Sequence, residues 1–131
     1  MRILSFIALC TFMMAGISVA QENQKFTTKS YVDILPELIL MESFSSVEGS
    51  HIVFDKPEGR IAESVYISDS VKAGQVEKFY AGILPQLGWT AGNQMQFVRE
   101  TEQLTIKTSE NDGVVTAKFM LSPYSAQNSA K

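Results

Sequence analysis

Alternation of apolar and polar residues in five segments of the chain predicts β-strands. These segments cover residues 51–55, 60–68, 94–100, 104–110 and 114–122. Successive side chains of a strand point to opposite faces, so a period of two indicates an antiparallel sheet with one face buried. Pro57 and Gly59 suit the turn of a first hairpin. Asn111, Asp112 and Gly113 suit the turn of the last hairpin.

The same alternation predicts which side chains share a face of the sheet. The apolar face is expected to carry Ile52, Phe54, Ile61, Val65, Ile67, Met95, Phe97, Leu104, Ile106, Val115, Ala117, Phe119 and Leu121. The polar face is expected to carry Tyr66, Gln96, Glu100, Thr105, Lys107, Thr116 and Lys118. A layer that covers only the apolar face would complete the fold.

A helical pattern lies between the second and third predicted strands. Starting at Val76, apolar side chains recur with helical spacing at Phe79, Tyr80, Ile83, Leu84 and Leu87. Asp69 or Ser70 is expected to cap the start of this helix. Its apolar stripe would pack on the apolar face of the sheet.

The end of this helix has its own signals. Pro85 is expected to kink or tighten the last turn, since it has no N–H to donate. Gly88 is expected to take the left-handed capping conformation, with Trp89 packing back on Leu84. An aromatic ligand platform formed by Tyr80 and Trp89 is the alternative, but core packing suits both positions better. Phe79, Tyr80, Leu84, Pro85, Gly88 and Trp89 are therefore interpreted as structural residues.

The order strand, strand, helix, strand, strand, strand predicts an α+β fold. We expect a two-layer sandwich with one main helix on a five-stranded, mostly antiparallel sheet. Residues 31–44, YVDILPELILMESF, form an apolar run too short and continuous to assign to helix, strand or loop. They are expected to lie across the uncovered part of the apolar face or along a sheet edge. Otherwise they would form an exposed apolar patch that binds a partner.

The sequences at both ends of the chain are not expected to belong to the folded domain. Residues 1–20 read as a cleaved signal peptide, with Arg2 before an apolar run and Ala20 at the cleavage site. A retained membrane anchor is the alternative, although the run is shorter than the roughly 20 residues that span a bilayer. Residues 21–30 are expected to be a flexible lead-in, 31–123 a single domain, and 124–131 a frayed tail. The mature chain would then have no membrane span.

Cysteine content and charge indicate the cellular compartment of the chain and the classes of partner that it could bind. The only cysteine, Cys10, lies in the predicted signal peptide, so the mature domain would be free of cysteine, which favours a bacterial periplasm. The chain has 11 basic and 14 acidic residues, and its cations are scattered singly. Nucleic-acid binding would need a basic patch, so this class of partner is excluded.

No pattern in the sequence indicates catalysis, a metal site or a cofactor. His51 and Asp55 lie about 13 Å apart along one predicted strand, too far for a base and its orienting carboxylate. Acidic residues near the turns lack the spacing of a calcium loop. Asp55 and Arg60 could form an ion pair across the first turn, whereas the functional alternative makes Arg60 a contact for a carboxylate or phosphate.

Three stretches together resemble a group of small, uncharacterised exported proteins of alphaproteobacteria. They are FDKPEGRI, FYAGILPQLGW and FVRETEQLTI. In that group an FDKP hairpin precedes a helix that ends in Phe-Tyr, Leu-Pro and Gly-Trp, and the resemblance covers residues 33–123. The group's Pro-Gly turn after the first leucine-rich stretch is replaced here by residues 41–44. The architecture also resembles periplasmic accessory domains of envelope assembly machines, which is a likeness of fold alone.

These observations favour a non-enzymatic periplasmic interaction module with an envelope protein as its partner. Its contact surface is expected on the polar sheet face, an edge strand or residues 31–44. The candidate contact residues are Leu35, Leu38, Ile39, Met41, Phe44, Arg60, Tyr66, Lys107 and Lys118. The alternative is a carrier of a small ligand or lipid in a gap between helix and sheet. An unrecognised enzyme is the third hypothesis.

Overall fold

A computed structural model describes residues 28–125 of the chain. The strands are β1 (Tyr31–Val32), β2 (Leu35–Ile39), β3 (Ser45–Ser46), β4 (Ile52–Lys56), β5 (Gly59–Ser68), β6 (Thr90–Ala91), β7 (Gln96–Arg99), β8 (Glu102–Asn111) and β9 (Val114–Pro123). The helices are α1 (Ala73–Ile83) and the 3-10 helix η1 (Leu84–Leu87). The predicted signal peptide, residues 21–27 of the predicted lead-in and residues 126–131 of the predicted tail lie outside the described residues.

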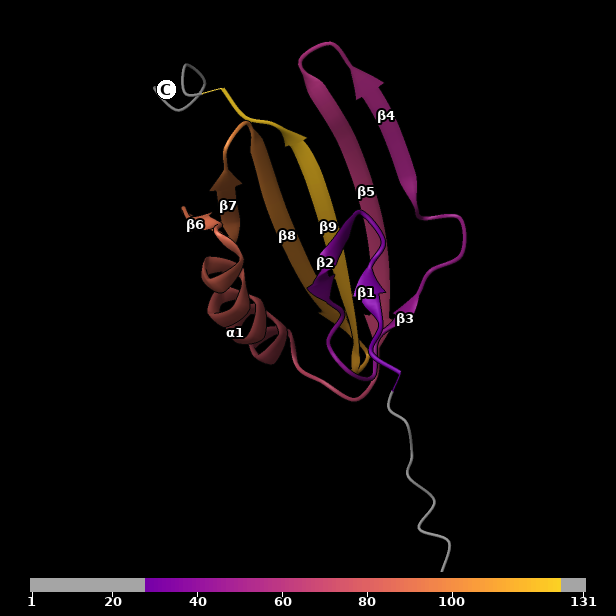
Figure 1. The fold of residues 1–131 in the computed structure, drawn as a ribbon. Coiled ribbons are helices and arrows are strands. Elements are labelled where there is room, and N and C mark those ends of the chain that lie inside the picture. The colour runs from indigo at the N-terminus through magenta and orange to yellow at the C-terminus, as the bar shows by residue number, and fades with distance from the viewer. Residues whose placement is uncertain (1–27, 126–131) are drawn as a thin grey trace, which may run out of the picture.

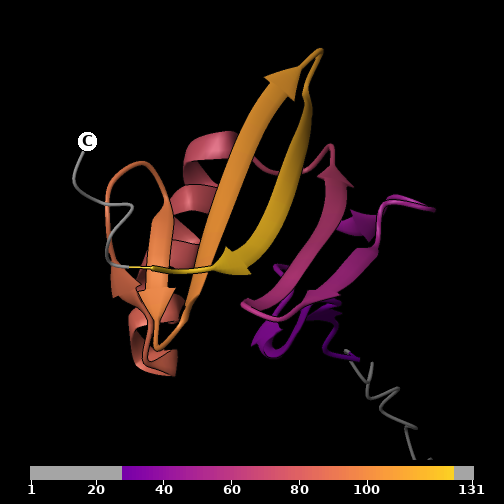
Figure 2. The ribbon, with the colours of Figure 1, turned by 90° about the horizontal axis from the view of Figure 1, so that it is seen from above.

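Seven strands form one antiparallel sheet. Its order is β3-β5-β9-β8-β7-β6, and β4 pairs with β5 on the same side as β3. The strands β5, β9 and β8 are the longest and form the centre, which is strongly twisted (Figure 1, Figure 2). The remaining strands, β1 and β2, form a separate two-stranded ribbon.

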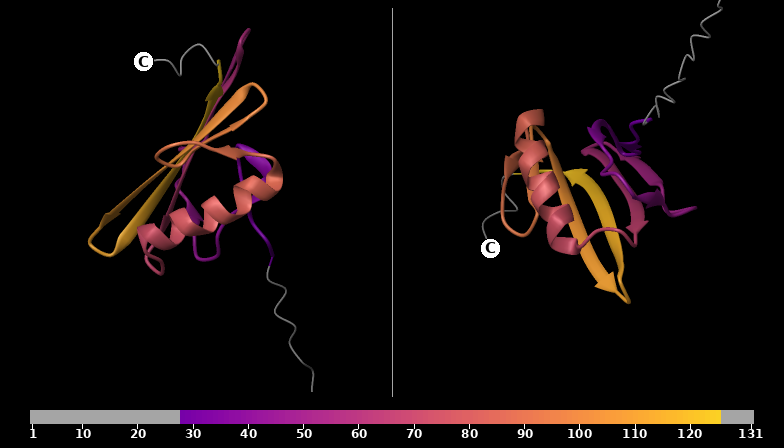
Figure 3. Two further views of the ribbon diagram at one scale, coloured as in Figure 1. Left: turned by 90° about the vertical axis from the view of Figure 1, so that its left-hand side faces the viewer. Right: turned by 90° about the horizontal axis from the view of Figure 1, so that it is seen from below.

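The helix and the ribbon cover the same face of the sheet. Figure 3 shows both on one side of the sheet, with α1 near β8 and the ribbon near β5. Phe119 of β9 lies between the helix and the ribbon. Its ring packs edge-to-face on Tyr66, under the ribbon, and on Tyr80 of α1. The core between the layers contains Val32, Ile34, Leu35, Leu38, Val76, Tyr80, Leu84, Phe97, Leu104, Ile106, Val115, Phe119 and Leu121.

The predicted α+β class, with one helix on a mostly antiparallel sheet, is confirmed. The strand count was wrong, since the sheet has seven strands and the ribbon adds two. The additional strands β3 and β6 have two residues each, too short to produce a visible alternation. Residues 31–44 contain the ribbon and do lie across the apolar face, where Leu35 and Leu38 are buried.

The predicted faces are correct for β7 to β9 and wrong for the first hairpin. In β5 the residues that face the core are Ala62, Ser64, Tyr66 and Ser68. Ile61, Val65 and Ile67 lie on the opposite face, as do Ile52 and Phe54 of β4. Apolar residues occur on both faces of β5, so alternation did not decide the orientation. Three small inward residues leave room for the leucines of the ribbon, which explains the observed orientation.

The helix begins later than predicted and ends as predicted. Its cap residue is Lys72 rather than Asp69 or Ser70, and the Lys72 N–H donates to the Gln75 side chain at 2.8 Å. Pro85 lies in η1, which tightens the last turn. Gly88 has a φ of 86° and takes the left-handed capping conformation, and the Trp89 N–H donates to the Leu84 carbonyl at 3.1 Å.

Candidate functional site

The strand β4 forms an open edge of the sheet. It pairs with β5 from Ile52 opposite Glu63 to Lys56 opposite Gly59, and no other described strand pairs with it. Lys56 and Gly59 close a two-residue turn, so they exchange backbone hydrogen bonds, and bonded pairs recur at every second position from there. The backbone N–H and C=O groups of Val53 and Asp55 therefore point away from β5. They are free to pair with a further strand.

The side chains of β4 are exposed on both faces of the sheet. Ile52 is 42% exposed, Val53 46% and Phe54 61%. Phe54 lies opposite Ile61 on the outer face, whereas Val53 lies opposite the buried Ala62 on the inner face. Figure 1 shows that this hairpin extends past the ribbon, which leaves its turn end uncovered. An edge that is both apolar and unpaired is a template for strand addition.

The other described edges of the sheet are short or protected. The strands β3 and β6 have only two residues each. The far half of β8 extends beyond β7, and side chains of α1 and its cap residue contact it there. There the Thr108 hydroxyl donates to Glu77 at 2.6 Å, and Lys72 pairs with Glu110 at 2.8 Å. Among residues 28–125, β4 is thus the long edge without such protection.

The sheet face away from the helix is divided into two parts. Near β4 it is apolar, with Phe54 opposite Ile61 and with Ile52 two positions before Phe54 on the same face. Toward β8 it is polar, and Lys118 pairs with Glu63 at 2.6 Å. Lys107 lies opposite Lys118 and is exposed. The predicted polar face therefore exists, but an apolar strip borders it.

Arg60 does not pair with Asp55 as expected. Its Nε donates to Glu102 Oε1 at 2.9 Å, so the arginine joins the turn end of β5 to the start of β8. Asp55 remains opposite Arg60 in the strand register, but no ion pair joins these two side chains. The guanidinium is thus already engaged by a carboxylate of this chain.

Three of the predicted contact residues are buried. Leu35, Leu38 and Tyr66 are at most 1% exposed, so the prediction that Tyr66 lies on the polar face was wrong. Burial raises the pKa of Tyr66, and its hydroxyl donates to Asp33 Oδ2 at 2.9 Å while accepting from the Asp33 N–H at 2.8 Å. These side chains hold the ribbon on the sheet and are not available at the surface.

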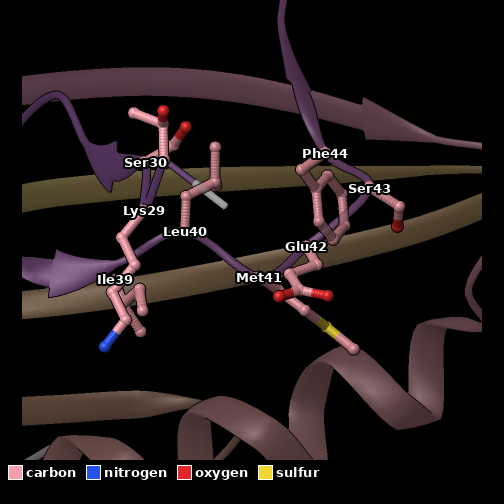
Figure 4. Close-up of a pocket in the computed structure, with 9 residues that line it drawn as sticks. Lys29, Ser30, Ile39, Leu40, Met41, Glu42, Ser43 and Phe44 are labelled. Atoms are coloured by element: carbon pink, nitrogen blue, oxygen red, sulfur yellow. The ribbon is translucent and has the colours of Figure 1, made fainter. Parts of the chain in front are cut away.

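The remaining contact candidates of this segment line a surface pocket. Ile39, Met41 and Phe44 are partly buried and border a hollow of about 460 Å³ together with residues 28–30, 40, 42 and 43. Figure 4 shows the side chains of this lining, including the charged Lys29 and Glu42. The pocket lies outside the packed contact between α1 and the sheet, where the Tyr80 and Phe119 rings are 5.0 Å apart.

The burial of Trp89 was predicted from the sequence, but its contact with Arg99 was not. Trp89 is buried, and its indole N–H has no hydrogen-bond acceptor among the described residues. The Arg99 guanidinium lies over its ring, donates to the Leu87 carbonyl at 3.2 Å and pairs with Glu37 at 2.7 Å. Burial raises the pKa of Glu37, but the Arg99 hydrogen bond, a backbone hydrogen bond and the charges of Arg99 and Arg60 together outweigh it, so the net pKa shift is downward. No signal in the sequence linked Arg99 to Trp89.

Metal-binding arrangements are not found in residues 28–125. No group of three or more His, Cys, Asp or Glu side chains in that range could hold a metal ion. His51, which directly precedes β4, and Asp55, near the end of β4, are both exposed. In the same range, no helix has the length and apolar character needed to cross a membrane. The open edge of β4 is thus the best-defined candidate site.

Comparison of the chain with protein-family models, with curated proteins and with solved structures finds no match in any of the three.

Proposed function

We propose that this chain is a non-enzymatic interaction module of the bacterial periplasm that binds an extended segment of a partner protein along β4. The observation that carries the proposal is the apolar and unpaired edge at Val53, flanked by the exposed Ile52 and Phe54. An added strand would satisfy the free backbone groups and cover these side chains, which is the mode of strand-addition domains. The predicted signal peptide supports the periplasmic location.

Site-specific photocrosslinking in living cells tests this proposal. A photoreactive phenylalanine analogue at position 54 should crosslink a bound protein, since that side chain borders the added strand. The same analogue at Lys107, on the polar part of the outer face, is the matched control. Crosslinking at position 107 and not at 54 would move the contact surface to the polar face and contradict the proposal. The absence of a product at both positions would also contradict it.

A pair of proline variants tests the strand-pairing mode. Val53→Pro removes an N–H that points to the open side, so the fold should keep its melting temperature while the crosslink at position 54 is lost. Phe54→Pro removes an N–H that bonds to β5, so it should lower the melting temperature. A crosslink that persists in Val53→Pro shows that backbone pairing does not hold the partner.

Recovery of the protein after osmotic shock tests the compartment. The chain should appear in the periplasmic fraction with Gln21 as its first residue, as cleavage after Ala20 predicts. Retention in the membrane fraction with residues 1–20 still attached would support the anchor instead.

The pocket beside residues 39–44 favours a second candidate function, transport of a small apolar ligand. Its lining is partly apolar, through Leu40, Met41 and Phe44. Native mass spectrometry of protein purified from the periplasm should then show a bound small molecule, which Met41→Glu should release. A mass equal to that of the chain alone would exclude this candidate.

A further inference from the structure

We propose that the strand which pairs with β4 is the β4 of a second copy of this chain, antiparallel about a two-fold axis at Val53. This inference rests on the proposed function of the β4 edge and names its partner. Two-fold interfaces are self-complementary, so the same segment of each copy supplies both halves of the contact. The residues of β4 and the backbone groups on its open side meet that requirement.

The backbone geometry restricts the possible registers. A two-fold axis perpendicular to the sheet keeps outer side chains on the outer face, so residues opposite each other must both have odd numbers or both even numbers. The bonds across the new pair must come from the odd positions, since Val53 and Asp55 point to the open side. An axis at Val53 satisfies both conditions, with Val53 of each copy exchanging hydrogen bonds.

Side-chain chemistry selects this register among its neighbours. With the axis at Val53, Ile52 lies opposite Phe54 of the second copy, and His51 lies opposite Asp55 of the second copy. Every apolar residue then faces an apolar residue, and an imidazole faces a carboxylate that can accept its N–H.

The neighbouring registers match less well. Moving the axis to Phe54 places Val53 opposite the Asp55 carboxylate and Ile52 opposite Lys56. Moving it to Asp55 places two carboxylates opposite each other and Val53 opposite Pro57, which has no N–H to donate. Moving it to Ile52 places Phe54 opposite Ser50 and Asp55 opposite Gly49. The axis at Val53 thus gives the best complement in charge and in apolar contact.

The outer face gives an independent reason for this partner. The apolar strip formed by Ile52, Phe54 and Ile61 would meet the equivalent strip of the second copy across the axis. Phe54 is 61% exposed, more than any other large apolar side chain in residues 28–125, and would be covered by Ile52 of the second copy. The two sheets would become one continuous sheet, and the unprotected edge would disappear.

Cysteine crosslinking of the full chain tests the register. In a Cys10→Ser background the chain has no other thiol, so Val53→Cys should form a disulfide-linked dimer under mild oxidation. Opposed residues at bonded positions have Cα atoms about 5.5 Å apart, within the range of a disulfide. Lys56→Cys is the matched control on the same strand, and its two copies would be too far apart to join. A disulfide dimer from Lys56→Cys and not from Val53→Cys would overturn the register.

Light scattering after size exclusion tests the partner. The wild-type chain should have twice the mass of one chain, and Val53→Lys should have the mass of a single chain with an unchanged circular dichroism spectrum. A wild-type monomer at every concentration, with no disulfide from Val53→Cys, would overturn the inference. If position 54 still crosslinks a different protein in cells, the proposed function of β4 stands and only the self-pairing falls.

Discussion

The guanidinium of Arg99 lies 4.4 Å from the centre of the Trp89 ring. This contact joins β7 to Trp89, two residues after the end of η1, and the same guanidinium pairs with Glu37 of the ribbon. A cation over an aromatic face is attracted by the ring, more strongly where water is excluded. Arg99 thus connects three parts of the fold: the end of the helix, the sheet and the ribbon.

We expect Arg99→Lys to destabilise the protein by about 1 to 2 kcal/mol, because lysine cannot stack on the ring and donate to both acceptors. Trp89 is the only tryptophan, so its fluorescence reports the change directly. Urea unfolding followed by fluorescence provides the measurement. Lys78→Ala, an exposed change on α1, is the control and should have little effect. An Arg99→Lys midpoint equal to that of the wild type would show that the contact does not stabilise the fold.

Gly88→Ala should destabilise the fold by about 1 kcal/mol, because alanine disfavours a φ of 86°. The cost is conformational, since an added Cβ would meet only Arg99 Cδ at an ordinary 3.7 Å. Gly82→Ala is a matched control: Gly82 lies in α1 with open space around its Cβ position. That change should stabilise the protein by about 0.5 to 1 kcal/mol. Thermal unfolding of both variants measures the difference, and shifts of the same sign would contradict this account.

Ionisation of the Tyr80 hydroxyl should make the protein less stable at alkaline pH. Burial raises the pKa of Tyr80 to about 12, above its ordinary value of 10. The unfolded chain therefore loses this proton first, so the stabilisation is complete below pH 10 and decreases as pH rises toward 12. The slope attributable to one proton is about 1.4 kcal/mol per pH unit. Denaturant titrations at several pH values should show this loss in the wild type.

The Tyr80→Phe variant provides the control for that titration. Its stability should decline less steeply above pH 10, because the group that titrates is gone. Below pH 10 it should be less stable than the wild type by about 1 to 3 kcal/mol, since the Met41 N–H loses its acceptor, the Tyr80 hydroxyl at 3.0 Å. Parallel curves for the two proteins across the alkaline range would refute the role of Tyr80.

Leu38→Ala should destabilise the fold by about 2 to 5 kcal/mol, because Leu38 is fully buried between the ribbon and the sheet. Glu42→Ala, an exposed change in the same segment, should be near neutral. Chemical unfolding measures both.

Deletion of residues 31–44 should abolish folding, since it would uncover Tyr66 and Tyr80 and remove several core side chains. A folded deletion variant would show that the ribbon is dispensable.

Local patterns predicted the parts of the fold that depend on near neighbours. The alternation in β8 and β9 gave the correct inward residues, such as Leu104 and Phe119, because one face there is clearly more apolar. The turn at Asp112 and Gly113 has the positive φ values that its residue types favour. The candidate site was predicted only as an unspecified edge strand, since alternation does not reveal which strand lacks a neighbour.

What the sequence by itself determined is therefore the class of fold and the helix with its Pro85 and Gly88 ending. Only the tertiary structure decided the inward face of β5, the place of residues 31–44 and the partners of Arg60 and Arg99. The physical reason is distance along the chain. Arg99 meets Glu37 across 62 positions and Arg60 meets Glu102 across 42, so packing and not local preference selects these contacts.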